Sequence, residues 1–386
     1  MAYIHGIQTT EATDLATSIV PISTSVIGIV ATAPDADAAA FPLNTPVRLI
    51  EAAAGIEKAG DTGTLVSALR DIAAQVRCPV VVVRVAPGAD AAATAAAVIG
   101  DPAATSGRVG MQALRDAQAI CGIKPRILGA PGLDTAAVAD ALAVVGEKLR
   151  AFVYAAATGA NDAALIAYAS NFDRRNLMLI VGDLSRSGDL VTVSGVATAL
   201  GLRARIDQEQ GWHKTLSNVP IAGIVGVTRP IGFDFQDEFT QANVLNAANL
   251  TVIVSVNGAF RFWGNRTTAA EESGYIFESA TRTAHVLIDE IAAGLIWAVD
   301  KPLTPSLAKD IVEKINARLD TLRNQGRLLG AKAKFVPANN STSELRLGRL
   351  RIDYDFTPVP PLEALLLRQT LTDQYFANFA ELATAA

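Results

Sequence analysis

Reactive and metal-binding side chains are scarce in this chain of 386 residues, which has three histidines, two cysteines and three methionines. The cysteines, Cys78 and Cys121, lie 43 positions apart, so they lack the close spacing of a zinc-binding pair. Both lie beside apolar segments. We expect them to be reduced packing residues, not a disulfide, which favours assembly in a reducing cytosol.

Charge and long apolar runs are also limited. Only 18% of the residues are charged while 50% are hydrophobic, which excludes an intrinsically disordered chain and suits two globular domains. No apolar run reaches the roughly 18 residues of a membrane span, so we expect no membrane insertion. The first residues, MAYIHGIQTTEATD, lack a basic region followed by an apolar region, so no secretory signal peptide is expected.

The glycine motifs of nucleotide and nucleophile chemistry are missing. The turn Gly129–Gly132, GAPG, lacks the G-x-G-x-x-G spacing that lets a backbone approach a pyrophosphate. No G-x-x-x-x-G-K-[ST] loop and no G-x-S-x-G elbow occur. The sequence therefore predicts no bound nucleotide and no cofactor of any kind.

Candidate catalytic side chains are isolated. His5, His213 and His285 are scattered and form no H-E-x-x-H motif. His213 follows Trp212, and a structural or interfacial histidine is favoured there over a general base. Asp183 follows an apolar strand candidate, where α/β enzymes place catalytic groups, but the sequence offers it no partner. We expect no catalytic residue and no metal ligands.

Short apolar runs alternate with helical segments between residues 23 and 269, which predicts an α/β body with a mostly parallel sheet. The expected strands are Ser25–Thr32, Pro79–Val85, Arg126–Gly129, Ala151–Ala155 and Leu177–Val181. The expected helices are Thr64–Val76, Met111–Ile120, Thr135–Leu149 and Asp162–Phe172, with Asp134 as the cap of the third. The alanine-rich segment 86–102 is expected to be an exposed loop with a helical turn.

Residues 270–361 change to an α+β pattern. Apolar residues at steps of three and four predict a long amphipathic helix from Phe277 to Leu295, with Pro302 ending it. A second stripe predicts a helix over Ser306–Gln325, stopped by Gly326. The strands expected after it are Ala331–Val336, Leu347–Phe356 and Leu362–Leu371.

Both ends of the chain are predicted to be extended arms. Residues 1–22 contain no helical period and too few apolar residues to fold alone. The proline-rich Thr357–Pro361, TPVPP, is expected to be a connector outside any sheet, because proline cannot donate a ladder hydrogen bond. Residues 362–386 then leave the body with unpaired edges, and such an arm is stable only when it pairs with another chain.

The charge is unevenly distributed. Residues 301–351 hold eleven Lys and Arg against four Asp and Glu, a net charge of +7, whereas the whole chain carries −5. Steps of 100° along the second helix place Lys309, Arg323 and Arg327 nearly together. A basic surface on an acidic protein favours an acidic partner, although a solvated helical face is an equal alternative.

Several segments, taken in order along the chain, resemble contractile tail sheath proteins of the P2-like phage group. They are YIHGIQ near the N-terminus, Asp35–Pro46 (DADAAAFPLNTP), Lys124–Thr135 (KPRILGAPGLDT), Gly201–Val219 (GLRARIDQEQGWHKTLSNV), Phe260–Thr267 (FRFWGNRT) and the C-terminal IDYDFTPVPPLE. Each motif alone is weak, and their common order along nearly the whole chain is what identifies the family.

This resemblance implies a structural protein that is not an enzyme. Sheath subunits of this group polymerise as stacked hexameric rings around a tail tube, and the cylinder contracts to drive the tube through a target envelope. The implied partners are copies of the same chain, the tail tube protein, and baseplate and tail terminator proteins, with no direct nucleic acid contact. The implied location is the virion tail, after assembly in the bacterial host cytoplasm.

The resemblance also assigns roles to segments. Residues 1–22 and 362–386 are linking arms, 23–269 the outer body, and 270–361 an inner, tube-facing polymerisation domain. Expected linkage residues are Ile4, Ile7, Ile19, Leu365, Leu367 and Leu371, and expected tube-facing residues are Lys309, Arg323 and Arg327. In FRFWGNRT, Trp263 is expected to pack, Gly264 to allow a turn, and Arg266 to pair with a carboxylate, with Thr267 completing the motif.

The alternative hypothesis is an α/β enzyme, such as a hydrolase or dehydrogenase, with a C-terminal oligomerisation unit. Electron microscopy of the purified chain distinguishes the two, because an enzyme forms small closed oligomers and a sheath forms long striated tubes.

Overall fold

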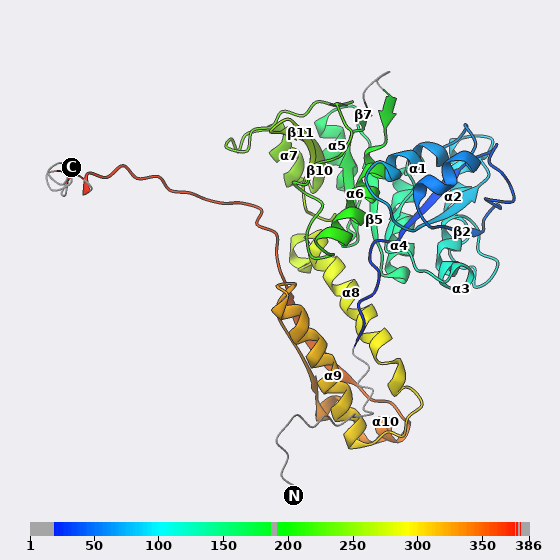
Figure 1. Cartoon of the computed structure of the whole chain (residues 1–386), viewed down its shortest axis with the longest axis vertical. Coiled ribbons are helices and arrows are strands. Elements are labelled where there is room, and N and C mark those ends of the chain that lie inside the picture. Colours follow the sequence, from blue (N-terminus) through cyan, green and yellow to red (C-terminus); the bar gives the residue numbers. More distant parts are fainter. Residues whose placement is uncertain (1–18, 187–190, 375, 377–378, 380–386) are drawn as a thin grey trace, which may run out of the picture.

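The computed structural model of the chain describes residues 19–186, 191–374, 376 and 379. An α/β body carries a narrow stalk made by the helices α8 and α9, and the end of the chain runs away from both (Figure 1). Ile4 and Ile7 lie outside the described residues.

An eight-stranded sheet forms the centre of the body, in the order β11-β10-β6-β5-β4-β1-β3-β2. The six inner strands are parallel and the edge strands β2 and β11 are antiparallel, which confirms the mostly parallel sheet. The strands are β1 (Ile27–Thr32), β2 (Pro46–Leu49), β3 (Val80–Val85), β4 (Ile127–Gly129), β5 (Phe152–Ala157), β6 (Leu177–Val181), β10 (Leu250–Val256) and β11 (Ala259–Trp263).

Two hydrophobic cores cover the two faces of this sheet. Alternate residues of β1 divide between them, since Ile27 and Ile29 join one core and Val30 the other. The first core is closed by α1 (Leu65–Ala73) and α6 (Gly195–Glu209). The second is closed by α2 (Ala91–Ile99), α4 (Ala136–Leu149), α5 (Asp162–Ala169) and α7 (Gln241–Ala247). A smaller sheet pairs β7 (Leu184–Arg186) with β8 (Val191–Val193) and β9 (Gly226–Val227).

The strands β2, β10 and β11 and the helices α6 and α7 were not among the expected elements of the body, and three further details differ from the sequence predictions. Residues 86–102 contain the nine-residue helix α2, capped by Asp90, which accepts a hydrogen bond from the Ala93 amide. The expected helix at 111–120 is a 3-10 helix, Gly110–Asp116, followed by the short α3 (Ala117–Cys121). Thr135 caps α4, because the Asp134 carboxylate accepts from the Ala156 amide instead.

The stalk contains α8 (Glu278–Gly294), α9 (Pro305–Asn324), α10 (Thr342–Arg346) and the hairpin β12 (Leu328–Phe335) and β13 (Ile352–Pro358). The two long amphipathic helices are confirmed, and Gly326 follows α9 with a φ of +71°. The first helix ends at Gly294, well before Pro302, and a 3-10 turn, Ile296–Ala298, follows it. This α+β unit confirms the predicted second fold class.

The last strand of the stalk is placed differently from the prediction. Leu347 ends α10, whose N-cap is Ser341, so the strand begins only at Ile352. It continues to Pro358, and Thr357 lies opposite Gly330 in the ladder. The first two residues of TPVPP therefore belong to the sheet, and the connector outside it is Val359–Pro361. Proline is tolerated here because Pro358 ends the strand beside a β-bulge.

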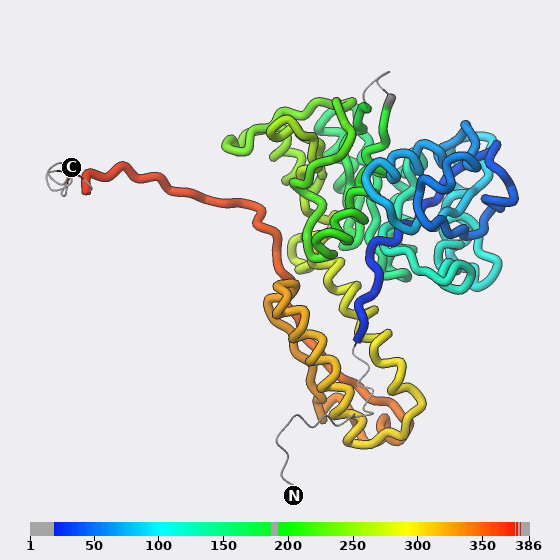
Figure 2. The backbone as a smooth tube through the Cα atoms, in the orientation of Figure 1, coloured from blue at the N-terminus to red at the C-terminus, as the bar shows by residue number. Residues whose placement is uncertain are grey.

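Within the described part of the C-terminal arm, Leu362–Leu371 forms no strand and runs extended away from the body (Figure 2). Its backbone therefore has no ladder partner in this single chain. The side chains of Leu365, Leu367 and Leu371 are 66%, 85% and 98% exposed. The arm is extended, as expected, but the strand expected over Leu362–Leu371 is not formed with any of the described residues.

The first described residues lie against the stalk of the same chain. Ile19 is buried beside α8, where a Cβ added to Gly294 would lie 2.3 Å from Ile19 Cγ1. The backbone of Ile22 donates a hydrogen bond to Glu290 of the same helix. Ile19 was expected to link subunits, and it packs within its own subunit.

Replacing Gly294 with Ala should displace this segment. The added methyl group would overlap Ile19, and overpacking of this kind costs about 1–3 kcal/mol. Hydrogen exchange of residues 19–24 should accelerate, and urea unfolding should shift to lower concentration. Gly330→Ala is the matched control, because a Cβ there meets no atom within 4 Å. Equal protection of residues 19–24 in both variants would contradict the packing described here.

Candidate assembly site: buried ionic networks, a basic helix and an arm

The carboxyl edge of the sheet, where α/β enzymes bind substrates, holds carboxylates engaged with backbone amides. Asp183 accepts from the Gly195 amide at 2.9 Å, and Asp71 accepts from the Ser194 amide at 2.9 Å. Burial raises the pKa of Asp71 and of Asp134 to about 6. These acids line a cavity of about 250 Å³. Among the described residues, no group of three or more His, Cys, Asp or Glu side chains is arranged to hold a metal ion.

The histidines and cysteines of the described chain are packing residues. The imidazole of His213 packs edge-on against the Trp212 ring. Its pKa is lowered mainly by burial and, to a smaller extent, by the positive charge of Arg327. Burial lowers the pKa of His285 to about 3, which keeps this side chain neutral. Cys78 and Cys121 are free thiols, as expected. Across residues 19–186 and 191–374, no helix has the length and apolar character of a membrane span.

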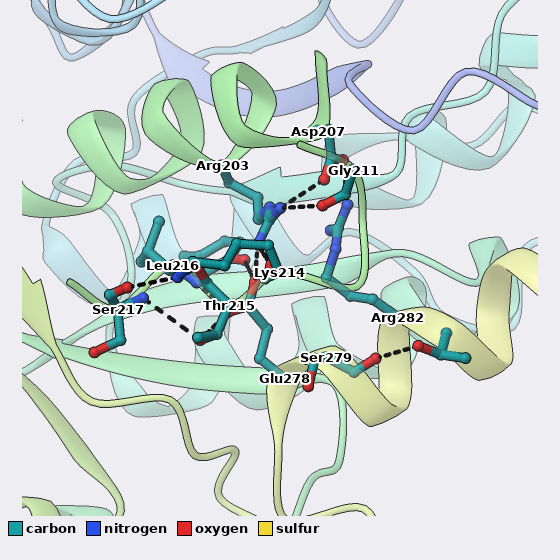
Figure 3. A network of polar contacts seen from close by, with 12 residues as sticks. Arg203, Asp207, Gly211, Lys214, Thr215, Leu216, Ser217, Glu278, Ser279 and Arg282 are labelled. Atoms are coloured by element: carbon teal, nitrogen blue, oxygen red, sulfur yellow. Dashed lines mark hydrogen bonds and ion pairs between the residues drawn. The ribbon is translucent and has the colours of Figure 1, made fainter. Parts of the chain in front are cut away.

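A buried ionic network joins α6 of the body to the first turn of α8 (Figure 3). Arg203 is fully buried and donates to Glu278 at 3.0 Å and to Asp207 at 2.7 Å. Arg282, one turn further along α8, pairs with the other oxygen of Asp207. Tyr154 of β5 donates its hydroxyl to Glu278. Four charges therefore meet with almost no solvent contact.

The network keeps Glu278 ionised in the interior. Burial alone would raise the pKa of this carboxyl, but Arg203 and Arg282 hold it below its ordinary value. Its second oxygen accepts from the Leu216 amide at 2.8 Å and from the Thr215 hydroxyl at 3.2 Å. A buried ion pair is tolerated only when its remaining hydrogen-bonding positions are filled in this way.

Further along α8, two more acids fix the stalk. Asp289 is held by Arg126, Arg150 and Lys124 of the body, the last with its Nζ 3.7 Å from the carboxylate. Glu290 accepts from Arg318 Nε of α9 at 2.9 Å. One helix is thus joined by ion pairs to the body on one side and to the rest of the stalk on the other.

The expected tube-facing residues do not share one environment. Lys309 and Arg323 have side chains 75% and 51% exposed, paired along α9 with Glu313 at 3.6 Å and with Asp320 at 3.0 Å. Arg327 is half-buried, and its guanidinium lies 5.9 Å from the centre of the Trp212 ring of the body.

The FRFWGNRT motif lies where the arm leaves the body. Trp263 packs edge-on against Phe233 with ring centres 4.7 Å apart, and Gly264 adopts a φ of +141° directly over Thr251. Thr267 is fully buried and donates its hydroxyl to the Tyr275 carbonyl at 2.9 Å.

Arg266 of the same motif makes the carboxylate pair expected from its sequence context. It donates to both oxygens of Glu363 at 2.8 Å each, and to Glu271 at 3.0 Å. Glu363 is the last residue of the IDYDFTPVPPLE segment, so two of the quoted motifs meet here.

The sequence did not predict the residues of the buried ionic networks around Glu278, Asp289 and Glu290. Arg203 and Asp207 lie inside the quoted Gly201–Val219 segment at an (i, i+4) spacing, which is typical of a surface pair on a helix. The apolar residues on both sides of Arg203, from Val196 to Ile206, were the available signal that this helix is buried.

Removing the carboxylate of Glu278 should strongly destabilise the fold. Glu278→Ala leaves Arg203 without one of its partners in the interior, which costs about 3–5 kcal/mol. Urea unfolding of the monomer measures the loss. Glu272→Ala, at an exposed position of the preceding 3-10 helix (Glu271–Ser273), should change stability by less than about 0.5 kcal/mol. Similar losses in the two variants would argue against an interior ion pair.

Comparison with known proteins identifies the family. The phage tail sheath protein central domain matches residues 106–268, and the phage tail sheath C-terminal domain matches residues 271–372. The tail sheath protein of Escherichia phage P2 is 44% identical over 97% of this chain and 97% of its own length. The major tail sheath protein of Serratia phage KSP20 is 44% identical over 99% of both chains.

Solved structures share the fold at low sequence identity. A sheath complex of an extracellular contractile injection system, in its contracted state, has a TM-score of 0.72 at 15% identity and covers 97% of this chain and 99% of its own. The contracted baseplate of the anti-feeding prophage has a TM-score of 0.73 at 16% identity, covering 97% and 100%. This chain belongs to the phage tail sheath family and is the structural, non-enzymatic subunit of a contractile virion tail.

Proposed function

We propose that this subunit polymerises as stacked hexameric rings around a tail tube, with its arms tying each ring to its neighbours while the bodies repack on contraction. The observation that carries the proposal is the described C-terminal arm, an extended apolar segment that reaches away from its own subunit (Figure 1). A baseplate of the anti-feeding prophage solved with 6-fold symmetry has the same fold, with a TM-score of 0.71 at 17% identity, and supports the hexameric ring.

The inner unit offers a place for a neighbour's arm. Its sheet has two strands, β12 and β13, and a two-stranded sheet is marginal in water until further strands join it. An apolar groove of about 630 Å³ lies beside it, between the start of α9 and the end of β12. Its apolar lining is formed by Leu303, Ala308, Val312, Phe335, Leu345 and Leu350, and the charged residues Lys309 and Glu313 also line it. An added strand with alternating leucines fits both features, through main-chain hydrogen bonds and side-chain burial.

The exposed basic side of the stalk fits an acidic tube. Residues 301–351 carry a net charge of +7, and Lys309 and Arg323 point into solvent on α9. Each exposed pair contributes only about 0–1 kcal/mol, so the sum over many subunits holds the tube while any one contact breaks easily. Arg327 is left out of this surface because it lies against Trp212. Baseplate and tail terminator proteins complete the proposed partners, at the two ends of the polymer.

Deleting residues 362–386 should leave a folded monomer that forms no tubes. The two cores of the body and the core of the stalk, formed mainly by α8 and α9, all lie before residue 362, so circular dichroism and urea unfolding should be unchanged. Sedimentation and electron microscopy measure assembly. Normal tubes from the truncated chain would overturn the linking role of this arm.

Reversing Arg323 to Glu should weaken tube binding without preventing polymerisation, because the arms remain and Arg323, unlike Lys309, does not line the proposed arm groove. We expect empty or already contracted cylinders, and a weaker dependence of tube retention on salt, since salt screens such pairs with a Debye length of about 10 Å at 0.1 M. The matched control reverses Arg70, an exposed residue of the outer body. Extended, tube-filled tails with unchanged salt dependence in the α9 variant would show that α9 does not face the tube.

A further inference from the structure

The base of the C-terminal arm is attached to the body at few points. The ladder with β12 ends at Pro358, and Pro360 and Pro361 have no amide hydrogen to donate. Between the arm base and the body lies a cleft of about 440 Å³, lined by residues 359–363 on one side and by Lys214, Trp263 and Arg266 on the other. The arm base, residues 359–363, therefore spans this cleft. The direction of the arm depends on the contact that holds the last of these residues.

The Arg266–Glu363 pair is this contact. Both guanidinium-to-carboxylate distances are 2.8 Å, the parallel two-bond geometry that fixes orientation as well as distance. Arg266 is itself placed firmly, because its backbone bridges to Phe277 at the start of α8 and the next residue, Thr267, is buried. The direction of the arm is thus set by the body as well as by the proline-rich connector Val359–Pro361.

The same pair is built to open. Its side chains are 26% and 39% exposed, so water and salt reach the contact. Arg266 also donates to Glu271 on the body at 3.0 Å. When Glu363 leaves, Arg266 keeps one carboxylate partner, and no unpaired charge remains behind. The cleft beneath the arm base leaves room for the backbone to settle in a second position.

We propose that Arg266 and Glu363 form a releasable latch that sets the direction in which the C-terminal arm leaves the subunit, with Glu271 holding Arg266 when the latch is open. This inference rests on the proposed linking role of the arm. A latched arm presents its leucines in one direction to a neighbour, and an open latch lets the body rotate while the far end of the arm stays bound.

Distances between spin labels in the soluble monomer test the latch without assembly. One label is placed at Leu366→Cys on the arm and the other at Glu238→Cys on the body, in a background with Cys121→Ser. The parent should give a single narrow distance distribution, which broadens at 1 M salt, where the Debye length falls to about 3 Å. Glu363→Gln should lose the narrow peak at low salt. Glu271→Gln, the matched control, removes an acid from the same arginine and should keep it.

Assembled sheaths provide the second measurement. Glu363→Gln sheaths should contract at lower urea concentration than parent or Glu271→Gln sheaths, because an unlatched arm no longer favours one orientation. A narrow monomer distribution in Glu363→Gln would overturn the latch. If that variant keeps the narrow peak while deletion of residues 362–386 abolishes tubes, the latch fails and the linking role of the arm survives.

Discussion

The burial of Glu278 constrains how this subunit can move. Glu278 is the first residue of α8. Its carboxylate lies in the interior of the body, where the positive charges of Arg203 and Arg282 balance its negative charge. Pulling α8 away from α6 would leave these charges unpaired in a medium that solvates them poorly. The top of the stalk therefore moves with the body as one piece. Asp289 adds a second fixed point further down the same helix.

The parts of the subunit that are not joined to the body by such buried ion pairs are freer to move. The body has two large cores, whereas the core of the stalk has eleven buried apolar residues among those described, and one of them, Trp212, comes from the body. Ile296, Val299, Leu303 and Leu347 remain exposed around the stalk, and its sheet has two strands. An element of this kind gains stability by contact with other subunits. A body with two large cores and a stalk with a small core and a two-stranded sheet suit a subunit that keeps its own fold while its contacts with other subunits change.

The sequence predicted five of the six parallel strands and both long stalk helices, and it missed β10, although residues 250–254 are nearly as apolar and as buried as the others. The central strands are continuous apolar runs because both faces are covered, and α9 has one apolar stripe because its other face is exposed to solvent. The helix α8 also has an apolar stripe, and the polar side chains on its other faces are buried in contacts with the body and with α9. The sequence did not predict α6, because this helix is covered almost all round and has no stripe to detect. It also missed the extent of α2, whose alanine-rich sequence has little contrast between faces.

The spacing of residues along the sequence did not predict the ion pairs between distant segments. Glu278 lies 75 residues from Arg203, and Arg266 lies 97 residues from Glu363, so no local period brings either pair together. Only the fold places them in contact. Arg266 was still expected to bind a carboxylate from its side-chain chemistry, whereas Arg203 was assigned no role, because Asp207 lies at the spacing of a surface pair and Glu278 is distant in sequence.

The buried and the exposed ion pairs of the subunit differ in strength. Pairs around Glu278 are buried, carry further hydrogen bonds, and are insensitive to salt. The pairs at Lys309 and Arg323 are largely exposed and individually weak, and the bidentate pair at Arg266 is partly exposed, so that salt can screen it. A polymer that rearranges as a whole needs this ordering, because the subunit must stay folded under a load that separates its contacts with neighbours. If the exposed pairs were as strong as the buried ones, stress would unfold the stalk before the contacts between subunits yielded.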